Sequence, residues 1–111
     1  IPVCPEILGG LPTPRPPAER QGEGVFTGTG TDVTEAYRRG AQEVLRLARL
    51  YGCTTAILKE RSPACGSGEI YDGSFTHTLT EGYGVAAELL QENGIRVLGE
   101  SELEDFLRGE T

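Results

Sequence analysis

The alternation of helical and strand-like segments after residue 31 constrains the fold of this chain most strongly. Apolar residues recur every three or four positions over residues 32–51, which predicts a long helix with one buried face. The run CTTAILKE at residues 53–60 is rich in Thr and Ile and predicts a buried strand. The same order then repeats, with a helix at 78–93, a strand at 95–99 and a last short helix from Ser101. Such alternation predicts parallel strands, because helices provide the crossover connections between them.

Three helix starts are marked by a capping residue that is followed three positions later by Glu: Asp32, Thr78 and Ser101. Gly52 and Gly94 follow the two longer helices and are expected to end them. The opposite, arginine-rich face of the first helix also carries glutamates, so we interpret it as a solvated surface. The buried stripe of that helix is predicted to consist of Val33, Tyr37, Ala41, Val44, Ala48 and Tyr51.

The N-terminal part is expected to be less regular. Residues 1–5 resemble the end of a short strand, and residues 9–24 contain too many Pro and Gly for a regular element. The chain begins with Ile1 rather than Met, and three parallel strands would make a thin sheet with two open edges. We therefore expect one domain over residues 1–111 that lacks an upstream strand and loop. The predicted fold class is α/β, a three-layer α/β/α sandwich around a small, mostly parallel, Rossmann-like sheet.

Composition argues against several functional classes. The chain of 111 residues is long enough for one hydrophobic core. Its formal net charge of −7 argues against nucleic-acid binding, which needs a basic face. No apolar run approaches the roughly 18 residues of a membrane-spanning helix. The odd number of cysteines, three, fits a reducing cytoplasm better than a disulfide-stapled secreted module.

Two cysteines are predicted to lie at the same edge of the sheet. Cys4 and Glu6 come at the end of the first predicted strand, and Ser62 and Cys65 lie in the loop KERSPACGSG after the second. Ligands of open α/β sheets bind beyond the carboxyl ends of the strands, so we expect the sulfur atoms of Cys4 and Cys65 within about 10 Å of each other. Cys53 begins the second strand, roughly 20 Å from Cys65 at about 3.3 Å per residue. We interpret it as a small buried hydrophobe.

The residues alone leave the chemistry of this edge open. The patterns S-P-x-C and C-P-E each occur by chance, and one interpretation is two loop thiols with no joint role. Two thiolates are too few for a structural zinc site or for an iron–sulfur cluster. Any further thiolate would have to come from outside this chain.

Four segments of the sequence together form a recognisable pattern: PVCPEILGGLPTPRPPAE (residues 2–19), DVTEAYRRGA (32–41), LKERSPACGSGEIYDGSF (58–75) and GYGVAAELLQENGIRV (82–97). They resemble the bacterial YbbK-like family of domains of unknown function, which includes the thiouracil desulfurases. The resemblance covers nearly the whole chain, and the proline-rich loop together with the S-P-x-C loop is a specific pair of motifs.

The resemblance implies a 4Fe-4S cluster that is held by three cysteines and whose fourth iron accepts the sulfur of a thiolated pyrimidine. Cys4 and Cys65 match two of the cluster ligands. Glu6 matches an acid/base that activates water or protonates the ring, and Ser62 matches a residue that contacts the substrate. These four residues are therefore the expected metal ligands and catalytic groups.

Three basic residues are expected to support this chemistry. Lys59 and Arg61 flank the loop of Cys65, where they would favour the thiolate and balance the charge of the cluster. Arg15, in the proline-rich loop, would donate to a carbonyl of the substrate.

The third cysteine of the family lies in a segment that precedes the first residue of this chain. The cluster is therefore expected in the full-length protein and not on residues 1–111 alone. The function implied is iron–sulfur-dependent desulfuration of a thiolated nucleobase or a similar small molecule. The alternative is a non-catalytic module that binds a metal, a cluster or a small ligand at the same edge.

Overall fold

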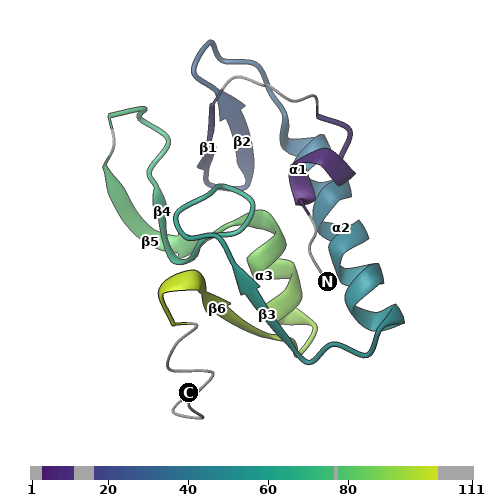
Figure 1. Cartoon of the computed structure of the whole chain (residues 1–111). Helices are drawn as coiled ribbons and strands as arrows, with labels where there is room; N and C mark the ends of the chain where they lie inside the picture. Colours follow the sequence, from purple (N-terminus) through teal and green to yellow (C-terminus); the bar gives the residue numbers. More distant parts are fainter. Residues whose placement is uncertain (1–3, 12–16, 77, 103–111) are drawn as a thin grey trace.

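The structure of the protein is a computed structural model that describes residues 4–11, 17–76 and 78–102 (Figure 1). It has a mixed α/β fold in which one long helix, α2, runs along one side of the molecule (Figure 1). In chain order the elements are α1 (Pro5–Leu8), β1 (Ala18–Gln21), β2 (Gly24–Thr27), α2 (Thr34–Leu50), β3 (Thr55–Leu58), β4 (Ser67–Tyr71), β5 (Leu79–Tyr83), α3 (Val85–Glu92), β6 (Arg96–Gly99) and the 3-10 turn η1 (Glu100–Glu102).

The predicted parallel pair is present. β3 and β6 lie side by side in parallel, with Leu58 opposite Gly99 (Figure 1). Their carboxyl ends meet at one edge, where the Ser101 N–H donates to Glu60 Oε1 at 2.6 Å. The second half of the chain therefore has the strand–helix–strand crossover that its sequence predicts.

Two antiparallel hairpins correct the predicted loop regions. β1 lies within residues 9–24, the stretch that composition predicts to be a loop, and pairs with β2, which begins at the last residue of that stretch. β4 pairs with β5 after the Cys65 loop. The β1–β2 turn contains Gly22 at φ +60°, a conformation that suits two-residue hairpin loops. Across such a turn the two strands satisfy each other's hydrogen bonds, and this outweighs the high Pro and Gly content of the region.

The helix start predicted at Thr78 is wrong. Residues 79–83 form β5, and α3 begins only at Val85. Gly82 and Gly84 disfavour a helix here, because glycine loses the most backbone entropy in one. The end of α3 is as predicted, since Gly94 follows it at φ +81°.

The N-cap of the long helix lies one residue later than its capping signal predicts. Asp32 Oδ1 accepts a hydrogen bond from the Thr34 N–H at 2.9 Å, and Val33 is the N-cap. Of the predicted stripe, Tyr37, Ala41 and Val44 are buried, while Val33 and Ala48 are half-buried. Tyr51 departs from the prediction with 63% exposure, because the helix ends at Leu50 and Tyr51 is only its C-cap.

The predicted strand over residues 1–5 is wrong where the structure describes it. Cys4 has extended backbone angles but serves as the N-cap of α1, and Pro5 opens that helix. Proline suits the first helical position because its missing N–H would have no partner there. Residues 1–3, and the predicted last helix beyond η1, lie outside the described residues.

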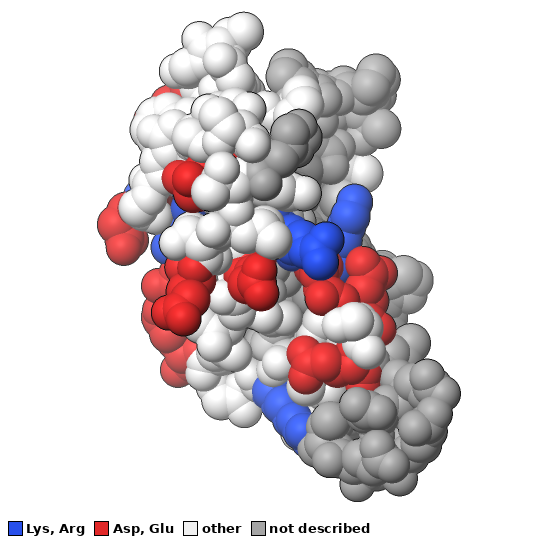
Figure 2. Space-filling model, turned by 90° about the vertical axis from the view of Figure 1, so that its left-hand side faces the viewer, with Lys and Arg blue, Asp and Glu red and all other residues white. Residues whose placement is uncertain are grey.

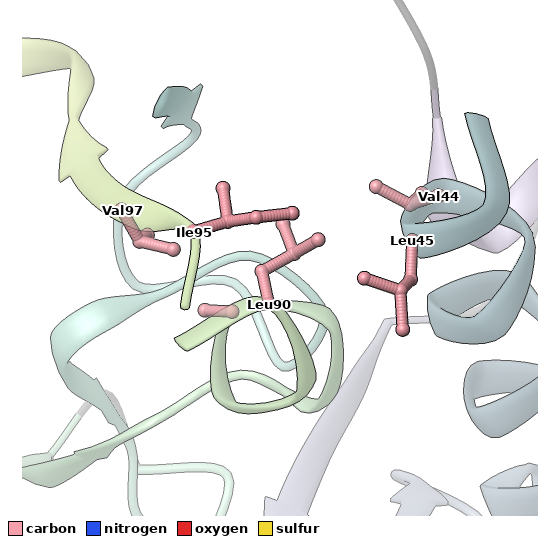
Figure 3. Close-up of a cluster of buried hydrophobic side chains, with 6 residues drawn as sticks. Val44, Leu45, Leu90, Ile95 and Val97 are labelled. Atoms are coloured by element: carbon pink, nitrogen blue, oxygen red, sulfur yellow. The ribbon is translucent and has the colours of Figure 1, made fainter. Parts of the chain in front are cut away.

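Two groups of buried apolar side chains form the core. In the first, Val44 and Leu45 of α2 face Leu90 of α3 and the β6 side of the molecule (Figure 3). Ile95 and Val97 complete that contact (Figure 3). The second group joins the N-terminal half of α2 to β2 and to the loop after β3, and it consists of Val25, Tyr37, Ala64 and Cys65. The predicted site residue Cys65 is therefore part of the core.

The described residues form three two-stranded sheets rather than one continuous sheet, and only β3–β6 is parallel. The α/β class is confirmed in this coarser sense, and the three-layer sandwich stays a prediction. No helix in the described ranges is long and apolar enough to cross a membrane. On the face drawn in Figure 2, Lys and Arg lie between groups of Asp and Glu and form no continuous basic patch. The absence of nucleic-acid binding stays a prediction.

Candidate functional site

Cys65 lies in a tight turn between β3 and β4, and we call residues 62–66 the Cys65 turn. The Ser62 hydroxyl oxygen accepts hydrogen bonds from the N–H groups of Ala64 and Cys65, both at 3.0 Å. The Gly66 N–H donates to the Ser62 carbonyl at 2.9 Å. Three hydrogen bonds to one serine therefore fix the backbone on both sides of the cysteine.

Backbone N–H groups at the start of α3 donate hydrogen bonds to carbonyl groups of the Cys65 turn. The N–H groups of Val85 and Ala86 donate to the carbonyls of Pro63 and Ala64, each at 2.8 Å. The Gly84 N–H donates to the Gly66 carbonyl, also at 2.8 Å. The N–H groups at a helix start have no partner within the helix, and here the Cys65 turn supplies their acceptors.

Glycine is required where the two segments meet. A Cβ atom at Gly84 would overlap the backbone of Ala64 and Cys65. The Cys65 turn therefore lies directly against the N-terminal end of α3. The dipole of a helix favours negative charge at that end, as on a thiolate or an anionic ligand.

Cys4 is positioned by a different contact. Its carbonyl accepts the Leu8 N–H at 3.0 Å, which closes the single turn of α1. That turn packs against α2 so closely that a Cβ atom at Gly40 would overlap the Pro5 carbonyl. A Cβ atom at Gly9 would likewise overlap the Ala36 carbonyl.

The N-terminal half of α2 connects the two cysteines. Tyr37 shares an apolar cluster with Cys65, and the neighbouring Gly40 contacts the residue after Cys4. Cys65 is buried and Cys4 is half-buried. Both cysteine-bearing segments thus pack on the same stretch of α2. Their sulfur separation stays a prediction.

Cys53 belongs elsewhere, as its position before β3 predicts. Its N–H donates to the Ala48 carbonyl at 2.8 Å at the end of α2. The thiol is half-buried rather than fully buried, which corrects that detail of the prediction. In the described part of the chain, no group of three or more His, Cys, Asp or Glu side chains is arranged to hold a metal ion.

The basic residues predicted to support Cys65 lie on the surface. Lys59 and Arg61 are exposed, and Arg61 has φ +67°, an uncommon conformation for a residue with a side chain. Between them, the hydrogen bond from Ser101 lowers the pKa of Glu60, and the charge of Arg61 adds a smaller effect. A hollow of ≈ 320 Å³ opens beside these residues, with neither cysteine in its lining: Glu60, Arg61, Ser67, Gly68, Glu69 and Glu81.

Two predicted site residues cannot be placed by their side chains. Glu6 is the second residue of α1, and its side chain lies outside the described part of the structure. Arg15 lies outside the described residues altogether. Their predicted roles as acid/base and as substrate contact stay predictions.

Sequence reasoning did not identify two residues that support the Cys65 turn. Gly84 allows the close approach just described. Arg20 donates to the Tyr83 carbonyl, directly before that glycine, at 2.5 Å. Neither residue carries a local signal for this role. Gly84 lies inside the stretch that is predicted to be helical, and the partner of Arg20 is 63 positions away in the sequence.

Three comparisons show which known proteins this chain resembles. A family model described as 2-thiouracil desulfurase matches residues 1–102. The uncharacterized protein YbbK of Bacillus subtilis (strain 168) is 48% identical over 115 residues, which cover 95% of this chain and 76% of YbbK. A solved structure of TudS, a 4Fe-4S-dependent thiouracil desulfidase, matches with a TM-score of 0.95 and 49% identity over 98% of this chain and 72% of that one. The chain therefore belongs to the 2-thiouracil desulfurase family, as its sequence resemblance predicts.

Proposed function

We propose that this protein removes sulfur from a thiolated pyrimidine such as 2-thiouracil, with Cys4 and Cys65 among the ligands of a 4Fe-4S cluster. The net reaction replaces a C=S group by C=O: water supplies the oxygen, the C–S bond breaks, and the sulfur leaves as hydrogen sulfide. No external oxidant or reductant is consumed. Family membership and the similarity to TudS support the proposal.

The observation that carries the proposal is the position of Cys65. Thiolates are the ligands of iron–sulfur clusters, and this thiol is buried in a turn fixed to a helix N-terminus. Cys4 adds a second soft donor at the start of another helix. Clusters of this kind take three or four protein thiolates, so these two would be part of the ligand set. When bound, the cluster would supply a Lewis-acidic iron that draws sulfur from the substrate.

The geometry of Ser62 limits what its hydroxyl group can do. A serine oxygen has two acceptor sites and one hydrogen to donate. Both acceptor sites are used by the N–H groups of Ala64 and Cys65. Ser62 would therefore act toward the substrate as a hydrogen-bond donor, for example to a ring nitrogen or to the carbonyl oxygen. The two N–H groups also stabilise negative charge on the hydroxyl oxygen, which strengthens it as a donor.

Glu6 would then manage the proton of the attacking water. A carboxylate close to the substrate carbon can accept a proton from water and return it to the leaving sulfur or to the ring. In this proposal Ser62, in the Cys65 turn, donates a hydrogen bond to the substrate, and Glu6, in α1, accepts and returns the proton. Lys59, Arg61 and Arg15 would contribute positive charge around the site.

The test is turnover by the full-length protein, reconstituted anaerobically with iron and sulfide. We expect 2-thiouracil to be converted to uracil with one equivalent of sulfide released. Cys53→Ala is the matched control, because Cys53 lies at the far end of β3, and it should keep wild-type activity. A preparation with a full complement of cluster that releases neither uracil nor sulfide would overturn the proposal and favour the non-catalytic module.

A further inference from the structure

Arg20 makes three polar contacts although it lies on a hairpin strand with no predicted role in the site. Its guanidinium donates from Nε to the Gly22 carbonyl at 2.8 Å and from Nη1 to the Tyr83 carbonyl at 2.5 Å. Its Nη2 atom pairs with Glu88 Oε2 at 2.6 Å. The arginine side chain is only 10% exposed, whereas that of Glu88 is 40% exposed. The planar guanidinium thus contacts its own hairpin, the end of β5 and the first turn of α3.

These contacts act on the residues that hold the Cys65 turn. Tyr83 directly precedes Gly84, whose N–H donates to the Gly66 carbonyl. Glu88 lies in the same helix as Val85, whose N–H donates to Pro63, and its own N–H donates to the Gly84 carbonyl. The start of α3 is therefore held by Arg20 on one side and holds the Cys65 turn on the other.

We propose that Arg20 is a positioning residue for Cys65: by holding the Tyr83 carbonyl and Glu88 together, it fixes the start of α3 and through it the turn that presents the thiol. The role of Cys65 as a cluster ligand rests on the proposed function, whereas the mechanical link does not. A fork of several donors in one plane suits this task, because a single ammonium group cannot reproduce its fixed geometry.

The other end of α3 provides a matched comparison. There Arg49 of α2 donates from Nη2 to Asn93 Oδ1 at 2.6 Å. This arginine also ties α3 to a neighbouring element, but at the end far from the Cys65 turn. If Arg20 only contributed general stability, loss of Arg49 would affect Cys65 in a similar way.

The experiment uses the full chain without iron, and it compares Arg20→Met, Arg20→Lys and Glu88→Gln with Arg49→Met. Hydrogen exchange reports on the amides of residues 84–87. The rate of iodoacetamide labelling, read by peptide mass spectrometry, reports on Cys65. Exchange of buried amides and labelling of a buried thiol both require local opening.

We expect Arg20→Met to speed up both processes by roughly tenfold, since a released helix start opens more often. Arg20→Lys should speed up exchange and labelling less than Arg20→Met does, because lysine keeps a positive charge opposite Glu88. Glu88→Gln should raise both rates by about threefold, because the hydrogen bond from Arg20 to the Tyr83 carbonyl remains. In Arg49→Met, the labelling rate of Cys65 should stay within about twofold of wild type. The labelling rate of Cys53 should stay within the same range in every variant.

Unchanged exchange and labelling in both Arg20→Met and Glu88→Gln would overturn the proposal, as would an equal effect of Arg49→Met. If Arg20→Met does not fold, the Glu88→Gln and Arg20→Lys results decide. After reconstitution, Arg20→Met should retain less iron per protein and lose kcat more than it raises KM, because the thiol and not the substrate pocket is displaced.

The outcome is separable from that of the proposed function. Faster hydrogen exchange and faster Cys65 labelling in Arg20→Met, in a protein that never turns over 2-thiouracil, would support the positioning role and contradict the desulfurase function. Normal turnover of 2-thiouracil, with unchanged hydrogen exchange at residues 84–87 in Arg20→Met, would support the desulfurase function and contradict the positioning role.

Discussion

The two cysteine-bearing segments are held in place in different ways. The Cys65 turn is fixed by hydrogen bonds, from its own Ser62 hydroxyl and from the first N–H groups of α3. The Cys4 segment is fixed by close packing, because Gly9 and Gly40 let α1 and α2 approach without intervening side chains. Close approach matters at the Cys65 turn as well, because a Cβ atom at Gly84 would overlap the backbone of Ala64 and Cys65. The hydrogen bonds of the Cys65 turn come in addition to this close approach, so a substitution that removes one of them should affect Cys65 more than Cys4.

The largest expected effect is the loss of a thiol from either segment. Cys65→Ala should remove iron and activity together, because a cluster that normally has three thiolate ligands is not retained on two. Cys4→Ala should do the same if both segments contribute to one cluster. The measurement is iron per protein after reconstitution, with Cys53→Ala as the control. A Cys4→Ala protein that keeps its iron would show that Cys65 is a cluster ligand and that Cys4 is not.

A second prediction separates proton chemistry from cluster binding in the Cys4 segment. Glu6→Gln keeps the size and hydrogen-bonding reach of the side chain but cannot exchange a proton. Iron content should stay near normal while the rate of desulfuration falls by roughly 10²- to 10⁴-fold, the usual contribution of a general acid or base. Iron and rate are measured on the same preparation. Loss of iron would reassign Glu6 to support of the cluster, and full activity would remove it from the mechanism.

The third prediction tests the close backbone approach at each of the two segments. Gly40→Ala and Gly84→Ala both add a methyl group where no space exists, so each should cost about 1–3 kcal/mol of unfolding free energy. Gly84→Ala should also speed up labelling of Cys65, whereas Gly40→Ala should act mainly on Cys4. Urea unfolding and peptide-resolved alkylation measure both effects.

Gly94→Ala is the control for that pair. Gly94 has open space around its Cβ position but a φ of +81°. The substitution should therefore lower the free energy of unfolding by roughly 1 kcal/mol through backbone strain, and the labelling of both cysteines should not change. If all three variants label alike, close packing is not what positions the thiols.

The smallest expected effect concerns Glu60, at the edge beside the Cys65 turn. The hydrogen bond from Ser101 lowers the pKa of Glu60 in the folded protein. A carboxyl group with a lowered folded pKa adds stability that is fully present above its unfolded pKa of about 4.3 and is lost as the pH falls through the folded value. Glu60→Gln should therefore flatten the decline of stability below about pH 4, and only slightly, because solvent screens the interactions of a carboxyl group at the protein surface. Urea midpoints at pH 7 and pH 3, with Glu92→Gln as the control, would show it. An identical decline in both variants would contradict it.

The parts of the fold that could be predicted are those with a strong local pattern. The stripe of α2 and the apolar runs of β3 and β6 bury one face each, so their periodicity is visible in the sequence. β5 has no such pattern, since four of its five residues are exposed, and its Thr-rich start instead resembles a helix cap. β1 and β2 are short and lie within a Pro- and Gly-rich stretch, where composition outweighs the two-residue turn signal.

The same distinction applies to the site. Ser62 and Cys65 could be predicted, because reactive residues in the loop after a buried strand point to the ligand-binding edge of an α/β fold. The contributions of Arg20 and Gly84 could not, because each depends on which distant segment the folded chain brings into contact. The sequence likewise did not show that the Ser62 hydroxyl caps its own turn, since the chemical role of a serine depends on which of its acceptor sites are occupied.

The cluster assignment is tested by a crystal structure of the iron-loaded full-length protein, with anomalous scattering measured at the iron edge. We expect iron peaks within bonding distance of the Cys4 sulfur and of the Cys65 sulfur, both belonging to one cluster. A cluster ligated by only one of these two cysteines, or iron bound at the polar hollow lined by Glu60 and Glu81, would show that the assignment is wrong.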